Sequence, residues 1–359
     1  YRAWDGNYQF AYIVNVPSVD GFVAISKGTF IDRMWKDADK NPTSFEATDL
    51  AAANAALGAT PTVGTPFCFV QLVRVPHFDT FHMSASSTLG TKNFTSTGGG
   101  VVAFRAKNLI LDDGSTIAMN ALGYNGHTGM NGDGMSGAPS ACTTSNITFT
   151  GGACSSSLSI GGGGGGNGST SSLPYFSGGF GGSPSGNPAG GSAIYDNCGD
   201  GSCFGSLLNK IAMGGAGGAG YSSGGAPGGG IVYISAETIT VPTVASSYGT
   251  INVSGAIGSA GAGAGAGGSV ILFYKTINMT DHLNIKANGG GTTAGSGVSG
   301  GGGGGGRVHS MSCLGAGGVS QALNSANIDV TGGLAAAATN SGQNGGQGSY
   351  FKNEMACPF

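Results

Sequence analysis

The residues that could support catalysis are few, and the densest group is the stretch "PHFDTFH". It contains His77, Asp79 and His82, a carboxylate with basic partners of the kind used in general acid–base catalysis. Polysaccharide-active enzymes need paired carboxylates, and Asp112 in the turn-like "DDGS" would supply the second acid. On a strand, however, positions 77, 79 and 82 divide between the two faces. We therefore expect structural roles for these residues and no enzymatic activity.

Other acids of the glycine-rich part stand beside glycine or asparagine. Asn131 with Asp133 in "NGDG" and Asp196 with Asp200 in "YDNCGDG" offer the oxygen ligands that calcium prefers. Neither place matches the spacing of a known calcium loop, and turn formation accounts for the acids in both. Calcium is the one cofactor that the sequence leaves open, and we expect no other.

Seven cysteines occur without a C-x-x-C pair, which argues against a zinc site or thioredoxin-like redox chemistry. Their separations suggest three disulfides, which would join Cys142 to Cys154, Cys198 to Cys203, and Cys313 to Cys357. Such pairs require an oxidising, extracellular setting and leave one cysteine over. The alternative is that the cysteines are buried free thiols.

Residues that could bind or carry sugars are more numerous. Aromatic residues of the glycine-rich stretch at about 125–228 form the candidate glycan-binding set: Tyr124, Tyr175, Phe176, Phe180, Tyr195 and Phe204. Aromatic rings on loops stack on glycans, but the same rings also suit packing onto neighbouring strands. Sequons for N-glycosylation begin at Asn93, Asn146, Asn167, Asn252 and Asn278. In a chain so rich in serine and threonine, chance alone produces about as many, so the sequons carry little information.

Composition divides the chain near residue 97. Glycine supplies 74 of the 359 residues, and only 6 of these lie in residues 1–97. We expect an N-terminal α+β region over 1–97, with one short helix at about 46–57, which would serve as an assembly module. A glycine-rich β domain would follow over 98–359, with a loop-rich insertion at about 125–228.

Charged residues are only 9% of the chain and the net charge is -3, which argues against nucleic-acid binding. No apolar run approaches the roughly 18 residues of a membrane helix, so we expect no membrane span.

Three stretches of the glycine-rich part align without gaps: "GGVVAFRAKNLIL", "GGIVYISAETITV" and "GGSVILFYKTINM". In each, two glycines precede an apolar strand, and Lys107, Glu237 or Lys275 stands at one equivalent position. A short strand with alternating polarity follows each time, as in "TINVSGA" and "LNIKANG". A fourth, degraded copy begins with "GGRVHSMSC". The repeat predicts a mainly β, elongated, solenoid-like stack of two-strand units.

The glycine tracts between these strands have two interpretations. They are either flexible linkers or a layer of polyproline-II-like strands that exchange backbone hydrogen bonds. Each two-strand unit is too small to bury a core alone, so the units must stack. Because the tracts lead directly into strands, we expect the ordered layer.

The run "LVRVPHFDTFHMSASSTLGTKNFTSTGGGVVAFRAKNLILDDGSTIAMNALGYNG" resembles the glycine-rich surface and adhesin-like proteins of bacteria and phages. The glycine tracts are similar to those of phage tail-fibre tip adhesins, in which polyglycine-II layers present loops to a host receptor. This resemblance implies a location outside the cell or on a virion surface. It covers about residues 70–336.

Two classes of function fit these observations. The first is a self-assembling structural protein of a filament or coat, with other copies of the chain as partners. The second is an adhesin that binds a receptor or surface glycans. A polysaccharide-active enzyme ranks third.

Overall fold

The structure is a computed structural model, and it describes residues 13–15, 24–25, 73–94, 98–123, 125, 213–217, 225–241, 248–259, 262–278, 282–293, 298–313, 323, 325–336, 340–341 and 344–355. The helix predicted at about 46–57 lies outside these residues, as does most of the insertion predicted at about 125–228. Within the described residues helical structure is limited to the 3-10 turn η3 (Ser325–Asn327) and His282, and strands predominate. The predicted mainly β fold is confirmed.

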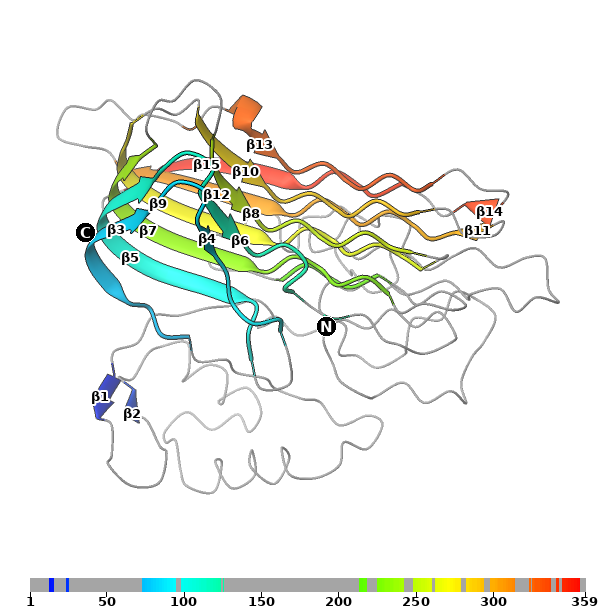
Figure 1. Cartoon of the computed structure of the whole chain (residues 1–359), viewed down its shortest axis with the longest axis horizontal. Helices are drawn as coiled ribbons and strands as arrows, with labels where there is room; N and C mark the ends of the chain where they lie inside the picture. The colour runs from blue at the N-terminus through cyan, green and yellow to red at the C-terminus, as the bar shows by residue number, and fades with distance from the viewer. Residues whose placement is uncertain are drawn as a thin grey trace. The chain divides into compact units, whose positions relative to one another are not determined.

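The larger sheet has six parallel strands in the order β15-β12-β9-β7-β5-β3 (Figure 1). The strands are β3 (His77–Met83), β5 (Val101–Leu111), β7 (Ile231–Thr240), β9 (Ser269–Asn278), β12 (Arg307–Cys313) and β15 (Ser349–Met355). Four of them, β5, β7, β9 and β12, begin directly after a pair of glycines, and β7 and β9 consist largely of β-branched and aromatic residues, which favour strands. The sheet already includes β3, which precedes residue 97.

The smaller sheet has five parallel strands in the order β13-β10-β8-β6-β4. They are β4 (Thr88–Leu89), β6 (Thr116–Ala118), β8 (Gly249–Asn252), β10 (Leu283–Lys286) and β13 (Ile328–Asp329). Along the chain, the first five strands of the six-stranded sheet are each followed by one strand of the five-stranded sheet. Each unit of the repeat therefore adds one strand to both sheets.

Two further strand pairs lie outside these sheets. β11 (Val298–Ser299) pairs in parallel with β14 (Asn340–Ser341). β1 (Ile13–Asn15) pairs in antiparallel with β2 (Ala24–Ile25), and these two strands belong to a compact unit separate from that of the other strands.

Strand pairing confirms the alignment of the sequence copies. Leu109 lies opposite Ile239, which lies opposite Ile277. The degraded fourth copy takes the next place in the sheet, because β12 pairs with β9. The copies thus stack one strand apart, as their identical internal spacing requires.

The hydrophobic core combines inward side chains from both sheets. In the five-stranded sheet, Ile251 lies opposite Ile117 on one side and Ile285 on the other, and all three are fully buried. The six-stranded sheet contributes a matching set that includes Leu109, Ile239 and Ile277. Stacking one branched side chain on the next removes apolar surface from water. Each Å² of apolar surface buried in this way contributes about 25 cal/mol of stability, which favours the parallel pairing.

Glycine tracts continue from both sheets. The outward tracts follow strands of the five-stranded sheet and cover residues 119–123, 253–258, 287–293 and 330–336. The return tracts precede strands of the six-stranded sheet and cover residues 225–230, 262–268, 300–306 and 344–348. Figure 1 shows the tracts running side by side away from the sheets, toward the end where β11 and β14 lie.

Backbone hydrogen bonds join outward and return tracts alternately into one lattice. One series runs from Gly345 through Gly333, Gly303, Gly290, Gly265 and Ala256, each of which donates its N–H to the next, and ends at the carbonyl oxygen of Pro227, with N···O distances of 2.8 to 3.0 Å. Other bonds join tracts of the same kind, for example Gly258 N to Gly291 O at 3.0 Å. The described glycine tracts are therefore an ordered, hydrogen-bonded part of the fold, as we predicted, rather than free linkers.

The lattice explains why glycine is required at many of these positions. A Cβ atom at Gly229 would lie 1.7 Å from the carbonyl oxygen of Val253, and one at Gly289 would lie 1.8 Å from that of Gly303. Real Cβ atoms never approach backbone so closely, so these tracts pack at a distance that only glycine permits. Alanine is accommodated at selected positions, such as Ala264 and Ala266, where it is fully buried.

Candidate binding surface

Many of the predicted site residues lie outside the described residues. These are Cys68, Cys142, Cys154, Cys198, Cys203 and Cys357, Tyr124, Tyr175, Phe176, Phe180, Tyr195 and Phe204, Asn131, Asp133, Asn146, Asn167, Asp196 and Asp200. The disulfides, the aromatic glycan contacts and the calcium positions therefore stay predictions. Of the three predicted sequons within the described residues, Asn93 and Asn278 are exposed and Asn252 is half-buried.

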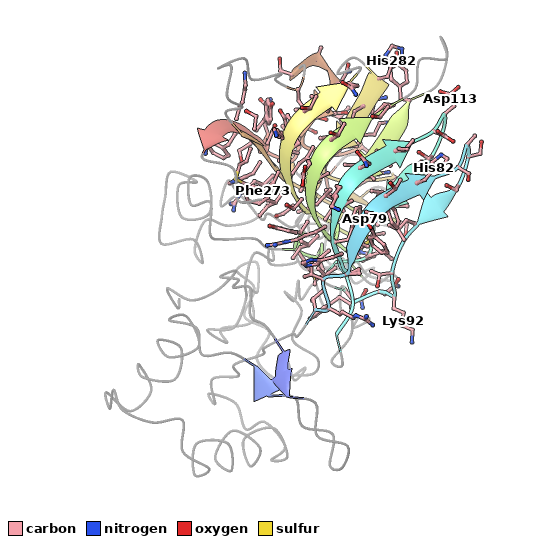
Figure 2. The ribbon with its side chains drawn as sticks, turned by 90° about the vertical axis from the view of Figure 1, so that its left-hand side faces the viewer. Asp79, His82, Lys92, Asp113, Phe273 and His282 are labelled. Atoms are coloured by element: carbon pink, nitrogen blue, oxygen red, sulfur yellow. The ribbon has the colours of Figure 1, made fainter. Side chains whose placement is uncertain are left out.

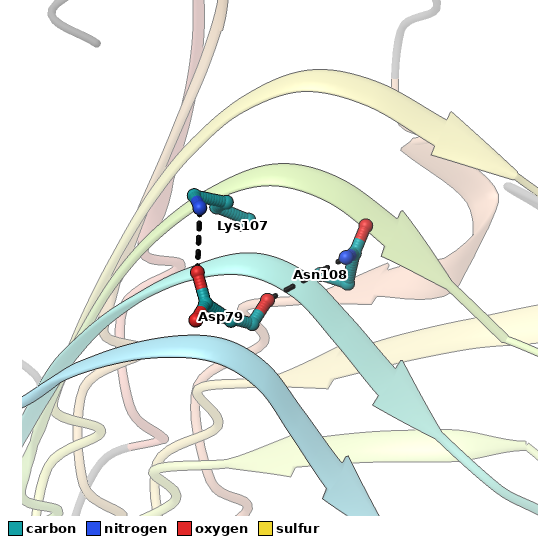
Figure 3. A network of polar contacts seen from close by, with 3 residues as sticks. All are labelled: Asp79, Lys107 and Asn108. Atoms are coloured by element: carbon teal, nitrogen blue, oxygen red, sulfur yellow. Dashed lines mark hydrogen bonds and ion pairs between the residues drawn. The ribbon is translucent and has the colours of Figure 1, made fainter.

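The acids considered for catalysis form two separate surface contacts. Lys107 Nζ donates to Asp79 Oδ1 at 2.5 Å, and Asn108 Nδ2 donates to the backbone oxygen of Asp79 at 3.5 Å (Figure 3). His82 Nε2 lies 2.8 Å from Asp112 Oδ2. Figure 2 labels Asp79 and His82 on the outermost strand of the sheet. The structure thus gives each acid a basic partner of its own and does not bring the two together as a pair.

Electrostatics also make Asp79 a poor proton donor. The hydrogen bond and positive charge of Lys107 lower the pKa of Asp79, whereas a catalytic acid needs a raised pKa near the working pH. The pKa of Lys107 is raised by Asp79, with a smaller contribution from the charge of Glu237. In the register of the sheet, Asp79, Lys107, Glu237 and Lys275 occupy one row of alternating charge. This row favours the observed pairing, because a shifted register would separate the opposite charges and place each beside an uncharged residue.

A second group of polar residues lies buried on the face of the six-stranded sheet that points away from the hydrophobic core. Arg307 and His309 on β12 are 2% and 1% exposed, and the His309 ring lies 5.1 Å from the ring of Phe351. Burial, together with the nearby charge of Arg307, lowers the pKa of His309 to about 4. The histidine is therefore neutral in the folded protein at physiological pH.

This burial predicts a loss of stability in mild acid. Because the pKa of His309 is about 4 when folded and about 6.5 when unfolded, protons favour the unfolded chain over that window. The destabilisation that His309 causes is absent above pH 6.5. It reaches about 3 kcal/mol near pH 4, at 1.36 kcal/mol per pKa unit. Urea unfolding at a series of pH values measures it, and His309→Phe should remove this part of the pH dependence. Parallel curves for the two proteins between pH 6.5 and 4 would contradict the assignment.

The most extensive polar network lies where the five-stranded sheet continues into the outward tracts. We call its members the polar grid, and they come from three neighbouring units: Asn252 and Ser254, Lys286 and Asn288, and Asp329 and Thr331. Asn288 Nδ2 donates to Asp329 Oδ2 at 2.6 Å, and the Thr331 hydroxyl donates to Asp329 Oδ1 at 2.9 Å. The backbone N of Asn288 donates to the Ser254 hydroxyl at 3.3 Å. These contacts hold the Asn288, Asp329 and Thr331 side chains in fixed positions.

Asp329 is the anionic centre of the polar grid. Burial alone would raise the pKa of Asp329, but hydrogen bonds from Asn288 and Thr331 and the charge of Lys286 outweigh it and lower the pKa. The carboxylate is therefore ionised at neutral pH. Lys286, its neighbour in the sheet, is exposed, so the grid carries one negative and one positive charge.

Two exposed aliphatic side chains lie beyond the polar grid on the outward tracts. Ile257 is 67% exposed and Leu334 is 70% exposed. Gly291 lies between them, because Gly258 N donates to Gly291 O and Thr292 N donates to Leu334 O. Together with the polar grid, these residues form a surface that combines charges, amides, hydroxyls and apolar edges.

Our sequence reasoning missed this surface, although the copies contain a signal for it. "INVSGAI", "IKANGGG" and "IDVTGGL" each show two polar residues around an aliphatic one, followed by glycine. Aligning the polar positions of the three copies would have placed all six grid residues in neighbouring rows.

Comparisons with protein-family models, with curated proteins and with solved structures give no match to this chain. Among the described residues, no three histidine, cysteine, aspartate or glutamate side chains are grouped so that they could hold a metal ion. In the same part of the chain, no helix is long and apolar enough to cross a membrane.

Proposed function

We propose that this chain is an extracellular binding protein of the adhesin class, in which a solenoid-like stack of two-strand units and a polyglycine-II-like lattice form a rigid scaffold. The observation that carries the proposal is the common direction of the glycine tracts. Each outward tract leaves the sheets and each return tract comes back to them, so the described ends of the tracts, near residues 259, 262, 293 and 336, lie at the end of the lattice where β11 and β14 are. Loops grouped on a rigid scaffold are the usual position for recognition.

The outer surface of the lattice also supports a binding role. The outward tracts carry side chains on their free face, including Ser254, Ile257 and Leu334, which would prevent another glycine layer from packing there. A coat that grows by adding glycine layers would need a bare face. The partners we propose are a receptor or glycans on a cell surface.

Binding to a printed array of bacterial and mammalian glycans and to labelled bacterial cells would test this proposal. Gly-Ser segments of equal length would replace residues 293–298 and 336–340 in the full chain. The matched control would replace residues 112–115, which form a turn where the strands of the two sheets meet. We call the replacements of residues 293–298 and 336–340 the tip replacements. We expect them to abolish binding and the replacement of residues 112–115 to preserve it. Absence of any binding by the unmodified chain, or binding that both tip replacements leave unchanged, would overturn the proposal.

A self-assembling filament subunit is the second candidate, because β3 and β15 are edge strands of the described sheet and edges can pair with another copy. The register makes this pairing short. β15 lies level with residues 73–79, so only its last residues would meet β3 of a copy stacked in line. Regular fibres of fixed rise in electron micrographs of the purified chain would favour this candidate over the adhesin.

A further inference from the structure

We propose that the polar grid, together with Ile257, Gly291 and Leu334, is a binding site for a single neutral pyranose residue of a glycan. The inference rests on the proposed binding function, but it assigns a site on the side of the lattice instead of the connections at its end. It is carried by a glycine at which a side chain would meet much less of the lattice than at its neighbours, by a set of hydrogen-bonding groups and by the local charge.

Gly291 differs from its neighbours in the same tract. A Cβ atom at Gly289 or Gly290 would lie 1.8 or 1.9 Å from a backbone oxygen, so the lattice demands glycine there. A Cβ atom at Gly291 would meet only the backbone of Leu334, with the nearest atom at 3.2 Å. Nothing else lies within 4 Å of that position, so we infer a shallow notch at Gly291 between two exposed aliphatic side chains. Neighbouring tracts lie about 4.8 Å apart, as strands do, so the notch is about 10 Å wide.

The polar grid supplies directed hydrogen bonds beside this notch. Asp329 Oδ2 accepts one hydrogen bond from Asn288 and retains capacity for another. Asn288 Oδ1 is buried from solvent and is not one of these groups, so the role of Asn288 is to hold the Asp329 carboxylate in place. Lys286 offers an exposed ammonium group with three donors. Asn288 precedes Gly291 by three residues, or about 9 Å along a polyproline-II strand, so one ring with its hydroxyls reaches from the notch to the near end of the grid, where Asn288 contacts Asp329.

The chemistry of these groups selects the ligand. A pyranose has C–H surfaces that suit the Ile257 and Leu334 side chains and hydroxyls that suit amide, carboxylate and ammonium partners. The charges of Lys286 and Asp329 cancel, which favours a neutral sugar over a uronic acid or a phosphate. The site buries no aromatic ring, so we expect weak binding by one residue, strengthened where a glycan engages the tips at the same time.

Saturation-transfer-difference NMR on the full chain would test the site with methyl glycosides of glucose, galactose, mannose and N-acetylglucosamine. Gly291→Leu fills the notch, and Thr88→Leu places the same side chain on β4, away from the grid. We expect at least one glycoside to bind the unmodified chain, Gly291→Leu to weaken that binding at least tenfold, and Thr88→Leu to leave it unchanged. Lys286→Gln should weaken it severalfold. The thermal unfolding midpoint of Gly291→Leu should stay close to that of the unmodified chain, which separates loss of the site from loss of the fold.

The experiments distinguish rejection of this sugar-binding site from rejection of the proposed adhesin function. If Gly291→Leu binds glycosides as well as the unmodified chain, the inferred site is wrong, whereas array binding that depends on the tips would still support the adhesin. If none of the glycosides binds the unmodified chain, the site is also wrong. A dimer that Gly291→Leu dissociates in sedimentation experiments, without glycoside binding, would assign the notch to a second copy of the chain and overturn the inference.

Discussion

Gly289→Ala is expected to destabilise the protein by about 3 kcal/mol or more, whereas Gly291→Ala should cost less than about 1 kcal/mol. The two glycines lie two residues apart in one outward tract. A methyl group at Gly289 would overlap the carbonyl oxygen of Gly303 at 1.8 Å, so two hydrogen-bonded tracts would have to separate. At Gly291 the methyl group meets one backbone oxygen at 3.2 Å and otherwise faces outward.

Urea unfolding followed by circular dichroism would measure both variants. The substitution is the same in both, so differences in the unfolded chain largely cancel. A separation of at least about 2 kcal/mol between the two is the expected result. Equal and small effects would mean that the tracts are not packed against one another at the distances described.

Ile251→Ala should cost about 3 kcal/mol, within the 2 to 5 kcal/mol typical of truncating a buried isoleucine. Ile251 is fully buried between Ile117 and Ile285, and the parallel stack leaves little freedom to close the cavity. The matched control is Ile257→Ala, which removes the same atoms from a side chain that is 67% exposed and should change the free energy of unfolding by less than about 0.5 kcal/mol.

The unfolding midpoint of each variant in urea gives this comparison directly. If Ile257→Ala proved as destabilising as Ile251→Ala, the outward tracts would have to bury Ile257, and the candidate binding surface would not be open.

The strand repeat could be predicted from the sequence because its signal is local. Leu109, Ile239 and Ile277 stand at the same distance from their glycine pairs, and parallel stacking turns that constant spacing directly into register. The pairing of β3 with β5 was not foreseen, because β3 has no glycine pair before it and its outward face is polar. Composition placed the domain boundary near residue 97, whereas the pairing of β3 and β4 begins before it.

The sequence analysis predicted that the glycine tracts are ordered, but it did not predict which tracts hydrogen-bond to each other. Every glycine offers the same N–H and C=O, so nothing in the sequence says that Gly303 donates to Gly290 rather than to another glycine. The partners follow from the strands that fix where each tract begins. The polar grid was missed for a similar reason, because Asn288 and Asp329 are 41 residues apart and meet only through the stacking of the copies.

Hydrogen exchange of the glycine amides tests the central claim most directly. NMR or mass spectrometry on the full chain would follow the amides of Gly265, Gly290, Gly303, Gly333 and Gly345, which donate to neighbouring tracts at 2.8 to 3.0 Å. If the tracts form a rigid lattice, these amides should exchange at least about a hundredfold more slowly than in an unstructured peptide, with protection close to that of β7 and β9. Exchange at the unstructured rate, beside protected β7 and β9 amides, would show that the tracts are mobile connections and would contradict the account.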